Sequence, residues 1–133
     1  MTKILILILL SHPLYAEPLI RLDTVKTEDT NLQDFKIALH ITENCSICDR
    51  QIAILKECAL PAKTGLFMEG GNEEIMRKIV RKKKIGMSVF NLTAEIKKYY
   101  AFNIKTPTMS IQTKTGLKTH EGLLECQAIK SQL

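Results

Sequence analysis

The sequence predicts an α/β domain in which helices pack on a small mixed sheet. Short apolar runs of strand length alternate with segments whose apolar residues recur at the spacing of one helix face. Near the C-terminus, two strand-like runs flank a turn at residues 114–116, which predicts a hairpin and therefore an antiparallel part of the sheet. Alternating strands and helices that end in such a hairpin are typical of an α/β fold with a mixed sheet.

The elements of the first half follow from short apolar runs and from the residues that end them. Pro18 is tolerated near the start of an edge strand, and Pro61 ends the helix that begins near Cys45. One face of that helix is formed by Cys48, Ile52, Leu55 and Ala59. The expected order is an edge strand over 17–25, a polar loop over 26–34, a buried strand over 35–42, the helix, and a strand over 64–71.

The second half begins with a helix that Asn72 caps. Glu73 and Glu74 suit its positive N-terminus. The buried stripe expected for this helix is Ile75, Met76, Ile79 and Val80. The remaining elements are a short strand or connection over 85–90, a helix over 91–102 capped by Asn91 or Thr93, strands over 106–113 and 117–123, and a helix over 124–133.

Residues 1–16 have the layout of a secretory signal peptide. Lys3 supplies a positive charge, residues 4–10 are an unbroken apolar run, and Pro13 precedes the small residue Ala16. The run is too short to span a bilayer core, which needs about 20 residues. The alternative is a buried N-terminal strand. We therefore expect a signal peptide over 1–16, one domain over 17–133, and a secreted or periplasmic location.

The composition argues against a nucleic-acid-binding protein. The net charge is +5, and many of the cations gather in residues 77–84. The chain offers three Tyr, four Phe and no Trp for base stacking. The basic run falls in the last turn of a predicted helix, where the helix dipole stabilises cations. We prefer this explanation to a binding patch.

All four cysteines lie after residue 16, and an exported protein meets an environment in which disulfides persist. Four cysteines allow three connectivities. The two-residue gap favours the pair Cys45–Cys48, which leaves Cys58–Cys126 by elimination. The alternative for the second pair is two buried free thiols.

The segment CSIC, from Cys45 to Cys48, stands where the strand over 35–42 gives way to a helix. The unpaired N–H groups and the dipole of a helix start stabilise a thiolate, which lowers the pKa of the first cysteine. Because the thiolate is the nucleophile in disulfide exchange, Cys45 is predicted to attack. Cys48, one turn further along, is predicted to release a bound partner by attacking Cys45.

The charges around the motif predict a thiolate of only modest stability. The two residues between the cysteines carry no cation, and Glu43 and Asp49 on either side oppose a negative sulfur. We therefore expect a couple more reducing than the strong periplasmic oxidants. His40 lies in the preceding strand and is expected to be packed or hydrogen-bonded there rather than to act.

Metal binding and a purely structural bond are the alternatives for the cysteine pair. A structural zinc site needs four ligands, usually two CxxC pairs or one such pair with histidines. The remaining cysteines, Cys58 and Cys126, do not form a second CxxC pair. A Cu(I) site on the two thiolates is harder to dismiss, because soft thiolates favour that metal. A structural disulfide with so short a gap closes a small loop and adds little stability. We expect no metal and no organic cofactor.

The order of elements resembles the thioredoxin fold. The strand that runs into CSIC at a helix start, the segment YAFNIKTPT at 100–108 and the hairpin segment GLKTHEG at 116–122 carry the resemblance, which covers residues 35–133. Within that fold, the pattern of motifs in this sequence resembles the exported thiol-disulfide oxidoreductases of the TlpA, ResA and MauD kind. This resemblance implies a central mixed sheet flanked by helices.

The resemblance also implies roles for further residues. It implies that the Thr106–Pro107 bond is cis and faces the disulfide, with the Thr106 backbone pairing with a bound substrate chain. An apolar strip around Ile47 and Pro107 would receive that chain. In such a fold the CxxC helix and the last helix pack on the same face, so a Cys58–Cys126 bond is geometrically feasible.

We therefore expect an exported thiol-disulfide oxidoreductase whose catalytic residues are Cys45 and Cys48. Its partners would be protein thiols or disulfides and a redox partner protein, without nucleic acid and without a stable membrane span. One alternative is a thioredoxin-fold structural or adaptor component of an envelope or secretion assembly, whose cysteines are structural. Another is a copper-binding protein that uses the CxxC thiols. The three interpretations differ in whether the pair exchanges, stays closed or holds metal.

Overall fold

The computed structural model describes residues 19–23, 27–28, 31–69 and 72–133, so the expected signal peptide over 1–16 lies outside the described residues.

The strands of the described residues form a two-stranded sheet, β1 and β2, and a five-stranded sheet with the order β5-β4-β3-β6-β7. β3 is parallel to β4 and antiparallel to β6, β4 is parallel to β5, and β6 is antiparallel to β7. The expected mixed sheet is confirmed. The strands are β1 (Leu19–Ile20), β2 (Thr27–Glu28), β3 (Ile37–Ile41), β4 (Thr64–Met68), β5 (Val89–Asn91), β6 (Thr108–Thr113) and β7 (Gly116–Glu121).

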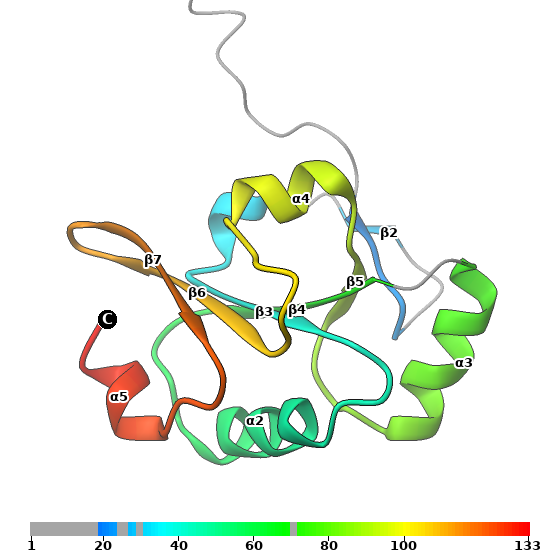
Figure 1. Ribbon diagram of the computed structural model, residues 1–133, viewed down its shortest axis with the longest axis horizontal. Helices are drawn as coiled ribbons and strands as arrows, with labels where there is room; N and C mark the ends of the chain where they lie inside the picture. Colours follow the sequence, from blue (N-terminus) through cyan, green and yellow to red (C-terminus); the bar gives the residue numbers. More distant parts are fainter. Residues whose placement is uncertain (1–18, 24–26, 29–30, 70–71) are drawn as a thin grey trace, which may run out of the picture.

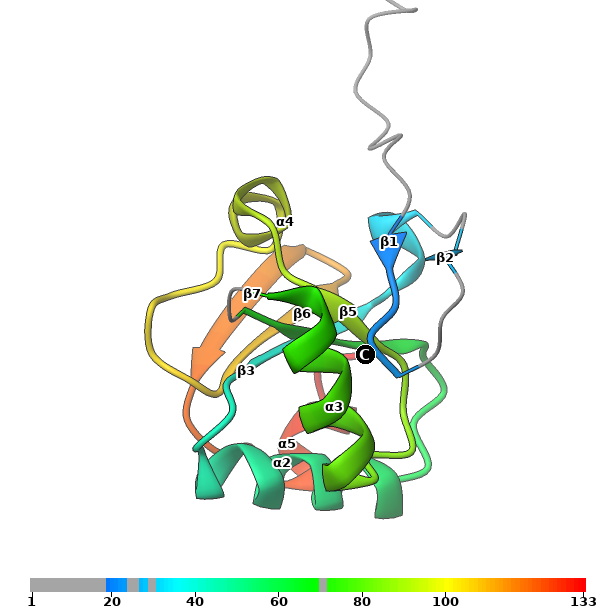
Figure 2. The same ribbon diagram turned by 90° about the vertical axis from the view of Figure 1, so that its right-hand side faces the viewer.

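Helices cover both faces of the five-stranded sheet. Figures 1 and 2 show α2, α3 and α5 on one face, and α4 with the short 3-10 helix η1 on the other. The described helices are η1 (Leu32–Asp34), α2 (Ser46–Glu57), α3 (Glu73–Lys83), α4 (Ala94–Tyr99) and α5 (Cys126–Lys130).

The sheet separates two buried clusters. Along β3, alternate residues point to opposite faces, so that Leu39 and Ile41 join one cluster while Ala38 joins the other. The first, which we call the disulfide-side core, includes Leu39, Ile41, Cys48, Ile52, Leu55, Leu66, Met76, Val80, Met109 and Ile129. The second, which we call the aromatic core, includes Leu19, Leu32, Phe35, Ala38, Phe67, Phe90, Ile96, Tyr100 and Phe102.

Two of the helices begin where the sequence predicts. The Asn72 side chain caps α3 by accepting hydrogen bonds from the N–H groups of Glu74 at 2.8 Å and Ile75 at 3.2 Å. Thr93 caps α4 by accepting from the Ile96 N–H at 3.3 Å, which decides between the two expected caps. The basic run over 77–84 does occupy the C-terminal part of α3.

Three details of the sequence prediction are wrong. The segment 26–34 is more than a loop, because it contains β2 and η1. The Asn31 N–H donates to Asp34 Oδ2 at 3.1 Å, the Asp34 N–H donates to the Asn31 carbonyl oxygen at 3.0 Å, and buried Leu32 anchors the turn in the aromatic core. Ile75 is 56% exposed, because it lies in the first turn of α3, outside the stripe made by Met76 and Val80. Ala59 lies beyond α2, which ends at Glu57.

The first described segment covers the β5 edge of the sheet. Arg21 forms an antiparallel bridge with Phe90. The Leu22 N–H donates to the Val89 carbonyl at 2.7 Å, and the Val89 N–H donates to Asp23 Oδ1 at 3.1 Å. Within the residues described, there is no helix of the length and apolar character needed to cross a membrane.

Candidate functional site

Cys45 and Cys48 form a disulfide at the start of α2, with their Cα atoms 5.1 Å apart. β3 ends at Ile41, so the short connection after it delivers Cys45 to the N-cap position of the helix. Cys45 is half-buried, whereas Cys48 is only 1% exposed and belongs to the disulfide-side core. Cys45 is therefore the more exposed of the two cysteines.

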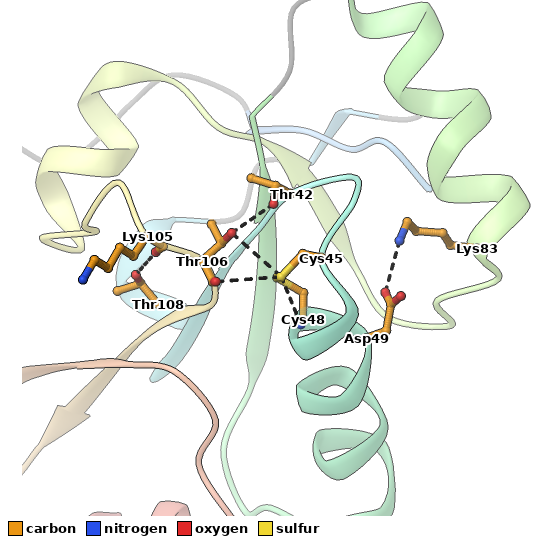
Figure 3. The surroundings of a disulfide bond; sticks show 8 residues. All are labelled: Thr42, Cys45, Cys48, Asp49, Lys83, Lys105, Thr106 and Thr108. Carbon is orange, nitrogen blue, oxygen red and sulfur yellow. Dashed lines mark hydrogen bonds and ion pairs between the residues drawn. A yellow bond between two sulfur atoms is a disulfide. The ribbon is translucent and has the colours of Figure 1, made fainter.

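Polar groups from two segments lie around Cys45 Sγ, and Thr42 supports one of them from a third (Figure 3). The Cys48 N–H donates to this sulfur at 3.1 Å. The Thr106 hydroxyl lies 3.9 Å away and the Thr106 carbonyl oxygen 3.8 Å away. Thr42 Oγ1 lies 2.9 Å from Thr106 Oγ1 and fixes that hydroxyl beside the sulfur. In the reduced protein, the N–H and hydroxyl donors would stabilise a thiolate on Cys45.

The loop before β6 carries the expected cis bond, between Thr106 and Pro107, and it faces the disulfide. The Thr108 hydroxyl donates to the Lys105 carbonyl oxygen, and the Gly122 N–H donates to the Pro107 carbonyl oxygen at 2.9 Å. These bonds hold the loop to β6 and to the end of β7. Thr106 is half-buried and Pro107 is buried, so contact of a substrate with either residue stays a prediction.

Two isoleucines in the segments that form the site are exposed. Ile47, between the cysteines, is 47% exposed, as the sequence analysis requires of a contact residue. Ile104 is 87% exposed and stands two positions before Thr106, whose carbonyl contacts the Cys45 sulfur. Sequence reasoning missed Ile104. The available signal was a single apolar residue in a polar stretch directly ahead of the Thr-Pro pair.

An ion pair connects the CxxC helix to α3. Lys83 Nζ lies 3.1 Å from Asp49 Oδ1, and Figure 3 shows the carboxylate on the side of the helix that faces Lys83. From its position beside the motif, Asp49 is expected to oppose a thiolate on Cys45. The structure shows that this charge has a cationic partner.

Solved structures with similar folds include thiol-disulfide oxidoreductases. StoA from Bacillus subtilis is 16% identical, with 90% of this chain and 98% of that chain covered and a TM-score of 0.64. The exposed lipoprotein thioredoxin Etrx1 from Streptococcus pneumoniae is 24% identical, with coverage of 85% and 93% and a TM-score of 0.63. A secreted Mycobacterium tuberculosis disulfide oxidoreductase, homologous to E. coli DsbE, is 14% identical, with coverage of 88% and 93% and a TM-score of 0.63. The chain has a thioredoxin-like fold. No protein-family model and no curated protein matches it.

In this thioredoxin-like fold, the second disulfide joins the end of the CxxC helix to the last helix. Cys58 and Cys126 have their Cα atoms 5.7 Å apart, which confirms the expected pairing over two free thiols. Nearby, the buried Gln51 side chain donates to the Leu124 carbonyl oxygen at 3.0 Å and accepts from the Leu124 N–H at 2.6 Å. Together the two contacts hold the segment before α5 against α2.

His40 lies on the other face of the sheet from the disulfide-side core. Its ring is buried and packs on Phe102 with centroids 5.3 Å apart, and Nδ1 lies 3.3 Å from the Asn103 carbonyl oxygen. Burial lowers the pKa of His40, so the ring is neutral near pH 7. With Nδ1 donating to Asn103, Nε2 is left without a partner among the described residues. The expected packed and hydrogen-bonded histidine is confirmed.

The described residues contain no cluster of three or more His, Cys, Asp or Glu that is placed to hold a metal ion. The Cys45–Cys48 pair thus stands without a third ligand of these types among them. The arrangement is suited to breaking and forming one sulfur–sulfur bond at the open end of α2.

Proposed function

We propose that the protein is an exported thiol-disulfide oxidoreductase that exchanges disulfides with partner proteins through Cys45 and Cys48. The observation that carries this proposal is the setting of the Cys45 sulfur at the N-cap of α2, among polar groups. Cys45 is the more exposed cysteine and its sulfur receives an N–H donor at the start of α2, whereas Cys48 is buried one turn further along. The Cys58–Cys126 bond also joins a buried and a half-buried cysteine, so the feature that sets Cys45–Cys48 apart is the Cys48 N–H and the Thr106 hydroxyl and carbonyl placed around the Cys45 sulfur. The thiol-disulfide proteins with similar folds support the same interpretation.

The exchange proceeds in two steps. In the reduced protein, the Cys45 thiolate attacks one sulfur of a partner disulfide, forms a mixed disulfide, and releases the second partner sulfur as a thiolate. Cys48 then loses its proton and attacks the Cys45 sulfur, which restores the Cys45–Cys48 bond and releases the first partner sulfur. The partner gains two electrons and the protein loses two. The reverse sequence oxidises a partner dithiol.

The surface around the disulfide suits an extended segment of a partner protein. Ile47, between the two cysteines, and Ile104, two positions before Thr106, are exposed and are proposed to offer apolar contacts. The Thr106 backbone is proposed to pair with the partner main chain, and buried Pro107 to hold the loop in place beneath it. A redox partner protein would dock on the same surface, because it must reach the same sulfur.

Export is part of the proposal. Residues 1–16 have the layout of a signal peptide, and both disulfides suit an oxidising compartment. Among the similar structures, one protein is described as secreted and another as an exposed lipoprotein. We therefore place the protein in a secreted or periplasmic location.

Trapping of partners tests the exchange reaction. The Cys48→Ser variant keeps the attacking thiol but cannot resolve the mixed disulfide, so it should accumulate covalent adducts with partner proteins on non-reducing gels. The matched control is Cys45→Ser, which should trap none, because its remaining thiol is buried. Adducts in neither variant, or in both equally, would contradict the proposal.

The reduction potential of the Cys45–Cys48 pair separates the proposal from its alternatives. A value between about −120 and −270 mV places the pair among redox catalysts, whereas a value below about −300 mV indicates a structural bridge. The second result would favour a structural or adaptor protein. Tight binding of Cu(I) by the reduced protein, lost in Cys45→Ser, would favour the copper-handling alternative.

A further inference from the structure

We propose that Lys83 is a positioning residue for Cys45: its ion pair holds the Asp49 carboxylate away from the sulfur that acts as nucleophile. The inference rests on the proposed function, since it concerns the reactivity of the same thiol. It assigns to α3 a role in setting how readily Cys45 ionises.

Asp49 and Cys45 compete for the same positive end of α2. The Asp49 N–H donates to the Cys45 carbonyl oxygen at 3.1 Å, which puts the aspartate one turn above the cysteine. A carboxylate in the first turn of a helix is drawn towards the free N–H groups there. One of these groups, the Cys48 N–H, already donates to Cys45 Sγ. A carboxylate turned towards that end would repel a thiolate and compete for its donor.

Lys83 removes this competition by pairing with Asp49 from the side. Asp49 Oδ1 lies 3.1 Å from Lys83 Nζ, and the side chains are 57% and 23% exposed. In Figure 3 the carboxylate lies towards Lys83, on the side away from Thr106 and the Cys45 sulfur. The pair also places a positive charge near the motif, although CSIC itself contains none.

The fold fixes Lys83 in this place through a second contact between the same helices. Lys84 closes α3 in a left-handed conformation, with φ of 50°. The Lys56 ammonium of α2 donates to the Lys84 carbonyl oxygen at 3.4 Å. A surface hollow of about 340 Å³ between the two helices is lined by Asp49, Lys56, Lys83 and Lys84 together with Ile52, Ala53 and Ile85. The C-terminus of α3 is therefore docked against α2 at the level of Asp49.

Other charges near the disulfide do not replace this pair. Glu43 precedes Cys45 and is exposed, and its charge opposes a thiolate in every variant considered below. The Lys105 side chain, next to Thr106, points away from the disulfide in Figure 3. Lys56 and Lys84 line the hollow together with Asp49 and Lys83, and the Lys56 ammonium donates to the Lys84 carbonyl oxygen.

The test measures ionisation of Cys45 in the Cys48→Ser background, where it is the free thiol left when Cys58–Cys126 stays closed. The rate of alkylation by iodoacetamide is followed against pH. Lys83→Met should raise the pKa of Cys45 by about 0.2 to 0.7 unit, the range that exposed ion pairs produce. Lys83→Arg should restore the parent value, because a guanidinium can make the same pair.

Two controls separate positioning from net charge. Lys82→Met removes an equal charge from exposed Lys82 on the same turn of α3 and should leave the pKa of Cys45 unchanged. Asp49→Asn should lower that pKa, and adding Lys83→Met to it should change it far less than Lys83→Met does alone. The inference is overturned if Lys82→Met and Lys83→Met shift the pKa equally, or if the Lys83 effect persists in full without Asp49.

The outcome is independent of partner exchange. Alkylation and the reduction potential in glutathione buffers need only the isolated protein. With both cysteines present, Lys83→Met should shift the potential to a more negative value, because the reduced form loses thiolate stabilisation. If the shifts occur but Cys48→Ser traps no partner, the proposed function fails and the positioning role stands. If partners are trapped but the shifts are absent, the positioning role fails alone.

Discussion

Removing the Cys58–Cys126 disulfide should destabilise the protein far more than removing Cys45–Cys48. The two bonds close loops of very different length, with sequence separations of 68 and 3. In the loop-entropy model, the long loop corresponds to about 4.4 kcal/mol of stabilisation and the short one to about 1.6 kcal/mol at 25 °C. The expected difference between the two double Cys→Ala variants is therefore about 2.8 kcal/mol.

The two double Cys→Ala variants remove cysteines of similar burial. Each disulfide contains one buried and one half-buried cysteine: Cys58 and Cys48 are buried, and Cys126 and Cys45 are half-buried. Both variants lose similar apolar contacts, so the difference reports mainly the length of the closed loop. The hydrogen bonds between Gln51 and the Leu124 backbone are untouched in either case.

Urea titrations of the parent and the two variants under oxidising conditions measure the free energies of unfolding. The Cys58–Cys126 variant should show the lower midpoint and the smaller extrapolated free energy. Equal losses in the two variants, or a larger loss on removing Cys45–Cys48, would refute the division into a structural and a reactive disulfide.

Two further predictions concern buried polar groups. Tyr100→Phe removes a hydroxyl that donates to the Leu32 carbonyl at 2.6 Å and should lower the free energy of unfolding by about 1–3 kcal/mol, measured by urea titration. Burial raises the pKa of Tyr100, so the phenol loses its proton in the unfolded chain at a lower pH than in the folded protein. The free energy of unfolding of the parent should therefore fall above about pH 10. An equal fall in Tyr100→Phe would contradict this. Burial lowers the pKa of His40, so as the pH falls the imidazole gains its proton in the unfolded chain before it does so in the folded protein. The contribution of His40 to the free energy of unfolding should therefore be complete above about pH 6.5 and decline below it. Urea titrations at about pH 5 and about pH 8 should show a smaller decline in His40→Gln than in the parent; equal declines would contradict the assignment.

The features that the sequence predicts well are those set by local chemistry. Asn72 caps α3 because its side chain reaches N–H groups two and three residues along the chain. Cys45 stands at the start of α2 because an apolar strand changes there into helical spacing. The pairing of Cys58 with Cys126 follows from counting, once Cys45 and Cys48 are assigned to each other.

The features that escape prediction depend on packing between distant segments. Asp49 and Lys83 are 34 positions apart, and nothing local to either residue indicates that α3 ends beside α2. The exposure of Ile104 depends on how the loop before β6 lies over the site. Ile75 fits the helical period but is exposed in the first turn of α3, and periodicity does not say which turns of a helix a neighbouring element covers.

The covering of β5 by residues 19–23 has a consequence for synthesis of the chain. Asp23 and Val89 are 66 positions apart, so the first described stretch leaves the ribosome long before its partner strand exists. An unpaired strand edge is a template on which another chain can pair. Contacts of such sequence separation also form slowly, because most of the intervening chain must be placed first. The first described stretch therefore waits for β5 before it can pair, and a nascent chain that stops before β5 leaves the edge of β4 unpaired as well.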